Sequence, residues 1–274
     1  MAVSMADIQS LRKRTGAGMM DCKNALNESE GDFEKAIEII RKKGQAFAAK
    51  RSDRDASEGC VLAATKDDFA AIVAVNCETD FVAMNSEFID LTKSVLNAAV
   101  ENRPESIDAL KEISVNGSKV ADLITDKMGI TGEKMGLGAY EYLSAPTVIF
   151  YIHPGNKLAT IVGFNKANID TQVAKDIAMQ VAAMNPVALV AGDVSEEIKE
   201  RELNLAKEKA REAGKPENLL EKIAEGALTK FYKEFTLLQQ EFIKNPKQTV
   251  EQYLAEYDKE LAVTGFKRVS LNAE

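Results

Sequence analysis

Residues 15–26 of this 274-residue chain read TGAGMMDCKNAL, a glycine-containing break followed by apolar side chains at helical spacing. Two glycines within three residues favour an interruption, because glycine loses more backbone freedom on ordering than any other residue. Met19, Cys22 and Leu26 then recur three or four positions apart, which is the period of an amphipathic helix. The stretch therefore predicts one helix that ends near Thr15 and a second that begins near Met19.

The flanking sequence extends this pattern to a three-helix unit over residues 4–44. A second interruption falls at Gly31, and Asp32 can cap the helix that follows, because its carboxylate accepts hydrogen bonds from the free N–H groups of a first turn. We expect this third helix to end at Gly44 and a polar tether to occupy residues 45–58. The apolar positions of the first and third helices are Ile8, Leu11, Phe33, Ala36, Ile37 and Ile40.

From Gly59 the pattern changes to one typical of strands. Two runs rich in small and β-branched residues, 60–65 and 69–77, are separated by Lys-Asp-Asp and predict a hairpin. The elements expected next are a helix from Ser86, a helix at about 117–128 and a strand at 134–143.

The second half of the chain repeats this order. Its predicted elements are a hairpin of 146–153 and 158–164, a helix at 170–184, a helix near 250–257 and a last strand at 263–271. The fold class predicted is α+β, with two core subdomains of related plan.

One segment of the second half has no counterpart in the first. Residues 195–243 are rich in Glu, Lys, Ala and Leu, with an evident turn at Gly214–Pro216. This composition predicts a protruding antiparallel helical hairpin. The apolar side chains expected to face one another across it are Ile198, Leu205 and Ala206 on one helix and Leu219, Ile223 and Ala227 on the other.

The composition argues against some classes of binding partner and cellular location. A formal charge of −8 argues against direct nucleic-acid binding, which draws much of its affinity from neutralised phosphates. No stretch approaches the roughly 20 apolar residues of a membrane span, and the N-terminal residues do not read as a signal peptide. Three cysteines without CxxC spacing favour neither a disulfide framework nor a metal site, so we expect a cytoplasmic protein.

The residues needed for chemistry are sparse. His153 is the single histidine, and no nucleophile elbow accompanies it. The phosphate-binding patterns GxxxxGK[ST] and GxGxxG are both absent. We therefore expect no enzymatic activity, no cofactor and no bound metal, and interpret His153 from the residues alone as a polar end to a hairpin strand.

Two segments carry a family resemblance. Residues 15–26 (TGAGMMDCKNAL) and 76–83 (NCETDFVA) closely resemble the two most characteristic motifs of elongation factor Ts. Weaker matches follow in order at 130–133, at the strand ending at His153 and at 179–183. The resemblance extends from about Ala6 to Val269.

The resemblance implies an architecture that agrees with the reading above. It consists of an N-terminal three-helix module similar to a ubiquitin-associated domain, two α+β core subdomains and a helical hairpin inserted in the second. We expect the module and its linker at 1–55, the first core subdomain at 56–145 and the second at 146–274, with the hairpin at about 190–243. Some relatives carry an additional C-terminal helix, which has no predicted counterpart before Glu274.

The resemblance also implies a partner, the GTPase elongation factor Tu, bound most tightly without nucleotide. Release of GDP is promoted by displacing the partner's magnesium ion, and the segment implied in this step is Thr79, Asp80, Phe81 and Val82. The Phe side chain wedges between helices near the nucleotide, and the Asp engages the same region. Further contacts are implied at Thr15, Gly16, Met19, Met20, Thr131, Gly132 and His153, although Thr131 is more polar than the residue common there.

Read without the family, several of these residues have plainer interpretations. Phe81 is typical of a buried core residue, Thr79 or Asp80 of a turn or helix cap, and Met19 and Met20 of core filler. An alternative function also stands, in which the N-terminal module binds peptides or ubiquitin-like folds and the rest is a non-catalytic scaffold. The sequence leaves open whether two copies pair.

Overall fold

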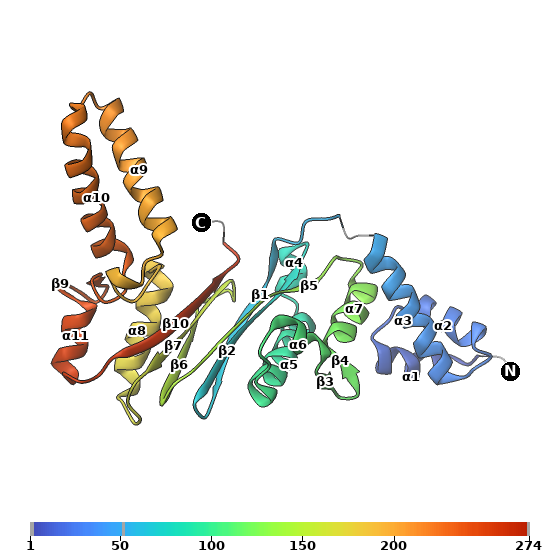
Figure 1. Cartoon of the computed structure of the whole chain (residues 1–274). Coiled ribbons are helices and arrows are strands. Elements are labelled where there is room, and N and C mark those ends of the chain that lie inside the picture. The colour runs from blue at the N-terminus through green and yellow to red at the C-terminus, as the bar shows by residue number, and fades with distance from the viewer. Residues whose placement is uncertain (1–2, 51–52, 273–274) are drawn as a thin grey trace.

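The chain begins with three helices, as residues 4–44 predict. A computed structural model describes residues 3–50 and 53–272 (Figure 1). Ser4 and Asp7 form a capping box, which satisfies free N–H groups at the first helix start. Gly16 ends that helix in the left-handed conformation, with φ at 71°. The helices are α1 (Met5–Thr15), α2 (Met19–Glu28) and α3 (Phe33–Lys50), and Leu11, Cys22 and Leu26 are fully buried between them.

The prediction that the third helix ends at Gly44 is wrong. Helix α3 continues through Lys50, and Gly44 is buried where α3 packs on α7 (Val120–Thr131). A glycine near a helix end signals either a terminus or a close approach of two backbones, and here it serves the second purpose. Residues 51–52 of the predicted tether lie outside the described residues.

The first half of the remaining chain forms an antiparallel sheet of order β1-β2-β5. Its hairpin turns at Asp67, which adopts φ of 54°. Thr92 on the following helix is fully buried. The strands are β1 (Glu58–Lys66), β2 (Phe69–Cys77) and β5 (Gly136–Ser144), and the helices are α4 (Asp80–Ala83), α5 (Ser86–Asn102), α6 (Ile107–Glu112) and α7.

The second half forms an antiparallel sheet of order β6-β7-β10, again a hairpin whose second strand pairs with the last strand of its half. This shared strand order confirms two related α+β subdomains. The elements are β6 (Thr147–Ile152), β7 (Leu158–Phe164), α8 (Thr171–Met184), α11 (Val250–Tyr257) and β10 (Val263–Ser270).

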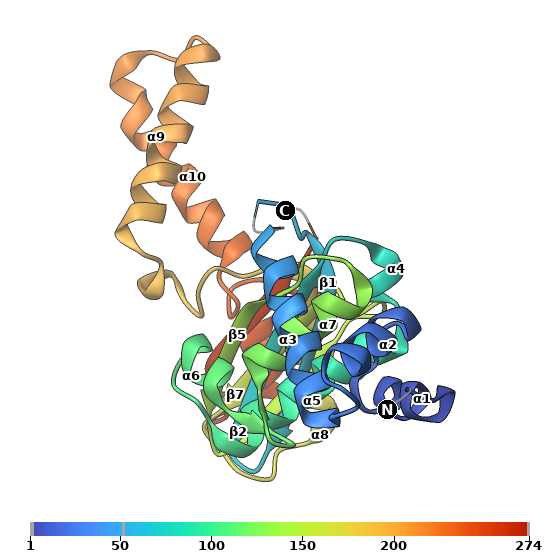
Figure 2. The same cartoon turned by 90° about the vertical axis from the view of Figure 1, so that its right-hand side faces the viewer.

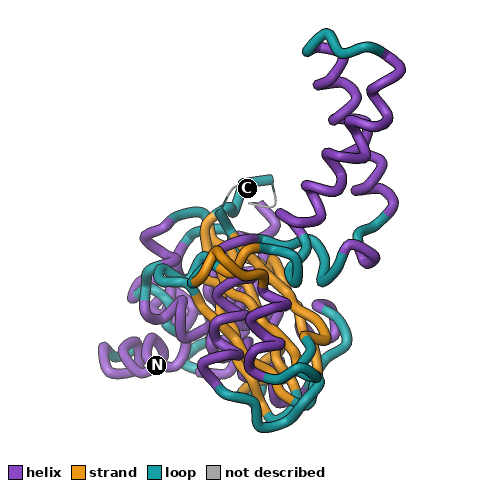
Figure 3. Tube along the Cα trace, turned by 90° about the vertical axis from the view of Figure 1, so that its left-hand side faces the viewer, coloured by secondary structure: helices purple, strands orange, loops and turns teal. Residues whose placement is uncertain are grey.

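The two sheets pack face to face. Along β2, Ile72 belongs to the layer between the sheets, whereas Val73 faces α5 and α7. In the second sheet, Ile161 meets the first sheet and Val162 faces α8. Both faces of β2 and β7 are thus buried, which accounts for their continuous apolar sequence. The layers run helix, sheet, sheet, helix, with strands at the centre of the molecule (Figures 1 and 3).

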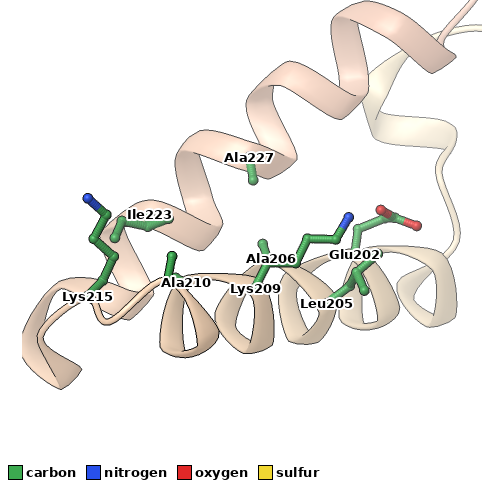
Figure 4. Close-up of a pocket in the computed structure, with 9 residues that line it drawn as sticks. Glu202, Leu205, Ala206, Lys209, Ala210, Lys215, Ile223 and Ala227 are labelled. Atoms are coloured by element: carbon green, nitrogen blue, oxygen red, sulfur yellow. The ribbon is translucent and has the colours of Figure 1, made fainter.

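The predicted helical hairpin projects away from these layers (Figures 1 and 2). It consists of α9 (Glu196–Glu212) and α10 (Leu220–Phe235), joined through Gly214 at φ of 70°. Figure 4 shows the apolar side chains between the helices around a shallow pocket of about 320 Å³. The residues from both helices that line it include Leu205, Ala206, Ala210, Ile223 and Ala227.

A buried amide pair fixes the root of the hairpin. Gln180 on α8 donates to the Gln240 side chain at 3.1 Å, and both residues are fully buried. Gln240 in turn donates to the carbonyls of Met184 (3.2 Å) and Glu234 (3.0 Å). Because buried amides are costly unless satisfied, this network holds α10 on α8 in one arrangement.

Short elements were not predicted. They are α4, α6 and two small hairpins, β3 (Ser114–Val115) with β4 (Ser118–Lys119) and β8 (Glu241–Phe242) with β9 (Asn245–Thr249). Over the described residues, no helix is both long enough and apolar enough to span a bilayer.

Candidate functional site

The segment Thr79–Val82 forms one helical turn that holds an aromatic ring in solvent. Thr79 caps α4, because its hydroxyl accepts from the amide of Val82 at 3.4 Å. Within α4, Ala83 points into the core while Phe81 is 80% exposed. The residue-only interpretation of Phe81 as a core residue is therefore wrong, since the direction of a single capped turn decides which side chain is buried.

A glutamate from the end of α7 holds this turn. The Glu133 carboxylate accepts from both the amide nitrogen (3.0 Å) and the hydroxyl (2.6 Å) of Thr79. Bonds to an ionised acceptor are roughly twice as strong as neutral ones. Glu133 lies in the weaker family match at 130–133, but sequence reasoning gave it no role, because its partner is 54 positions away.

A second glutamate forms the reciprocal contact. The Glu78 carboxylate accepts from the backbone amide of Lys134 at 2.6 Å and from the Arg54 guanidinium at 2.9 Å. The Lys134 ammonium donates to the Arg54 carbonyl at 2.7 Å. Residues 78–79 and 133–134 are therefore joined in both directions, and the base of α4 is rigid.

Substitution of Glu133 tests this clamp. Glu133→Gln removes the charge and one acceptor, and a charged hydrogen bond contributes about 1.5–3 kcal/mol. We expect the free energy of unfolding in urea to fall by about 1–3 kcal/mol in Glu133→Gln and by more in Glu133→Ala, because Thr79 loses its charged acceptor. Glu87→Gln is the matched control, because it loses only a surface ion pair with Lys127. Equal losses of stability in the Glu133 and Glu87 variants would contradict a role for the clamp.

Buried thiols underlie the site. The Cys77 thiol donates to the Thr79 carbonyl at 3.2 Å, and Cys60 lies in the same core. Burial raises the pKa of Cys77 to about 12, with the charges of Glu133 and Glu58 adding to the effect. Burial also raises the pKa of Cys60 to about 11, and the ordinary value is 9.0 for both.

These shifts predict a loss of stability at alkaline pH. Each folded-state pKa lies above the unfolded value, so the stabilisation is complete below pH 9 and is lost as the pH rises toward 11–12. We expect the free energy of unfolding in urea to fall by about 1–3 kcal/mol between pH 8 and pH 10. The Cys60→Ala/Cys77→Ala variant should show a shallower dependence, and parallel pH curves would refute this assignment.

The N-terminal motif reaches the same region through α7. A Cβ placed on Gly16 would lie 3.0 Å from the Ile130 Cδ1, so the end of α1 abuts the end of α7. Thr15 is half-buried, and its hydroxyl donates to the Leu11 carbonyl at 2.8 Å. Met20 is 64% exposed, whereas Met19 is half-buried and packs against the core of the three helices. Met20 therefore offers more surface to a partner.

The Thr131–Gly132 turn lies between these two segments. The Thr131 hydroxyl donates to the Lys127 carbonyl at 3.0 Å and accepts from the Glu133 amide at 3.3 Å. Gly132 closes α7 in the left-handed conformation with φ of 75°. The turn is half-exposed and orients Glu133 toward Thr79.

His153 is exposed at the end of β6, and its Nδ1 lies 3.0 Å from the Tyr151 hydroxyl. The β6–β7 turn is tied to β1, because the Val61 amide donates to the Asn156 carbonyl at 2.7 Å. Lys157 in this turn pairs with Glu58 at 2.8 Å. Glu58 raises the pKa of Lys157, and the nearby charge of Asp80 adds to this, so the hairpin tip and α4 occupy one edge of the molecule.

Contacts of the α7 end thus link Gly16 and the Thr79–Val82 turn, and Lys157 beyond His153 pairs with Glu58 of β1. Phe81 in α4 and Met20 in the first turn of α2 are both exposed apolar side chains. Within the described ranges, no group of three or more His, Cys, Asp and Glu side chains could hold a metal ion. Rigid, exposed aromatic and methionine side chains are typical of protein-binding surfaces.

The chain is thus an α+β protein with an N-terminal helical module and an exposed aromatic ring on a braced turn. The family described as Elongation factor TS matches residues 78–273. The chain is 63% identical to elongation factor Ts of Porphyromonas gingivalis (strain ATCC 33277), 53% identical to that of Azobacteroides pseudotrichonymphae genomovar. CFP2 and 45% identical to that of Bacteroides thetaiotaomicron (strain VPI-5482). Each comparison covers 100% of both proteins. The chain belongs to the elongation factor Ts family and is a translation elongation factor.

Proposed function

We propose that the chain binds elongation factor Tu and promotes release of its GDP by displacing the magnesium ion, after which GTP can bind. The observation that carries this proposal is the exposure of Phe81 on a turn braced by Glu133. An exposed ring on a rigid support binds with little loss of conformational entropy, and such rings are frequent hot spots at interfaces.

The proposed wedge uses the way in which proteins respond to insertion. Packed helices switch between discrete arrangements instead of deforming smoothly, so a ring inserted between two of them shifts a whole element. Magnesium demands near-ideal octahedral geometry, so a small displacement of its protein ligands considerably weakens the binding of the ion. Loss of the ion removes positive charge from beside the phosphates. In this proposal Phe81 is the wedge, and Asp80, which is exposed beside it, engages the same region.

The remaining contacts extend the interface along the same edge. We propose that Thr15, Gly16, Met19 and Met20 meet the GTPase from the N-terminal helices, and that Thr131, Gly132 and His153 contact it from the core. The exposure of Met20 supports this, and the smaller accessible surface of Met19 indicates a lesser share for that residue.

We also propose that the chain divides into the domains 1–55, 56–145 and 146–274. The boundary between the two core subdomains is supported by the sheets, since the first ends at Ser144 and the second begins at Thr147.

Thermodynamic linkage limits what such a factor does. If the chain lowers the affinity of the GTPase for GDP by some ratio, GDP lowers the affinity of the GTPase for the chain by the same ratio. The complex of the two proteins is therefore tightest without nucleotide. The chain accelerates exchange in both directions, and the concentrations of GDP and GTP decide the product. We therefore propose an exchange factor of the cytoplasm that makes and breaks no covalent bond, rather than an enzyme.

The test is release of fluorescent GDP from elongation factor Tu, followed by stopped flow with increasing amounts of the purified chain. We expect a large, saturable acceleration, and co-purification of the two proteins that excess GDP abolishes. If release keeps its spontaneous rate at every concentration, the proposal is wrong.

A further inference from the structure

The N-terminal helices are packed on the core through a pair of glycines. Where α3 crosses α7, a Cβ placed on Gly129 would lie only 3.1 Å from the Cα of Gly44. A Cβ on Gly44 would lie 3.4 Å from the Thr125 carbonyl oxygen. The two helices thus touch through bare backbone, which larger side chains would prevent. Figures 1 and 2 show α3 lying against α7.

Other contacts flank this crossing. The Ile130 side chain, one residue beyond Gly129, meets Gly16 at the end of α1. On α3, Arg41 donates to the Ser118 hydroxyl at 2.6 Å and lies 3.5 Å from the Asp126 carboxylate. Contacts at three places along α1 and α3 leave the three helices little freedom to move against the core.

The segment that runs from Gly129 to just beyond the end of α7 also supports the exposed aromatic turn. Four residues after Gly129, Glu133 clamps Thr79 at the base of α4. We propose that Gly129–Glu133 is a shared brace, which holds the Thr15–Met20 surface at a fixed position relative to Phe81 so that one partner meets both together. This inference rests on the proposed function and adds Gly44 and Gly129 as positioning residues.

A fixed position of the three N-terminal helices, the arm of the molecule, affects the affinity for the partner more than the rate of exchange at saturation. When one of two surfaces on a rigid body has bound, the second is already in place, and its effective concentration is high. A loose arm must be ordered again in each encounter, which costs conformational entropy. Phe81, however, reaches the GTPase from the core in either case. Loss of the crossing should therefore raise the concentration of factor that gives half-maximal exchange, and should leave the rate at saturation nearly unchanged.

Gly129→Leu tests the brace, because leucine is a good helix former and its side chain has no space at the crossing. We expect the half-maximal concentration to rise about tenfold while the saturating rate stays within about twofold. Gly44→Leu should give the same result, and Met20→Ala should raise the half-maximal concentration by less in either variant than in the parent chain. Gly226→Leu is the matched control, a helical glycine in α10 whose added Cβ would meet open space.

Distances measured within the chain make the test independent of exchange. Spin labels at Glu28→Cys and Asp90→Cys, both exposed positions, would report the placement of α2 against α5, since the three native cysteines are buried. We expect one narrow distance, broadened by Gly129→Leu. An unchanged distance in that variant, or an unchanged half-maximal concentration, would overturn the brace. If the parent chain does not accelerate GDP release, the proposed function fails, and the distance distribution alone decides whether the arm is fixed.

Discussion

Phe81→Ala should lose most of the acceleration of GDP release while the protein remains folded. The ring is 80% exposed, so its removal takes little from the core. Removing an interface hot spot costs about 2 kcal/mol or more, which corresponds to roughly a 30-fold loss or greater in the second-order rate of exchange. The measurement is stopped-flow release of fluorescent GDP at subsaturating factor.

Two controls accompany this result. Met84→Ala removes another large side chain, 67% exposed just after α4, and separates a specific role of the ring from a general loss of apolar surface. Urea unfolding of Phe81→Ala should differ from the parent chain by less than about 1 kcal/mol, as expected for an exposed position. Full exchange activity in Phe81→Ala would remove the proposed wedge.

Phe164→Ala should cause a large loss of folding stability, in contrast to the small change in stability expected for Phe81→Ala. Phe164 is fully buried at the end of β7, between the second sheet and its helices. Truncating a buried phenylalanine leaves a cavity and typically costs about 3–5 kcal/mol. We expect the urea midpoint to fall accordingly, with the slope of the transition little changed.

Phe235→Ala is the matched control for this prediction. Phe235 ends α10, stacks on Phe231 and is 38% exposed, so its truncation leaves a smaller cavity. We expect less than half of the loss seen with Phe164→Ala. Equal losses in the two variants would contradict the assignment of Phe164 to the core of the second sheet.

The sequence was sufficient to predict the order of the main elements. The hairpins around Asp67 and Gly155 were found because apolar runs flank polar turn residues, and both positions adopt positive φ. The long helices followed from their apolar period, and the helical hairpin from its composition and the turn near Gly214. What these patterns have in common is that they are local.

The packing of these elements lay beyond such patterns. Gly44 reads as a helix end unless the opposing Gly129 is known, and Glu133 reads as a surface acid unless Thr79 is placed beside it. The stacking of the two sheets was not predicted, although the continuous burial of β2 and β7 is its signature. Exposure of Phe81 depends on how one capped turn is oriented, which composition does not encode; only the family motif pointed to the surface.

The central claim is that Phe81 acts through the partner's magnesium ion, and chelation tests this most directly. GDP release from elongation factor Tu would be measured with the parent chain and with Phe81→Ala, first in excess magnesium and then in excess chelator. If the ring works by displacing the ion, the difference of roughly 30-fold or more expected in magnesium should shrink to within about threefold once the ion is already gone. A difference of the same size under both conditions would contradict the account.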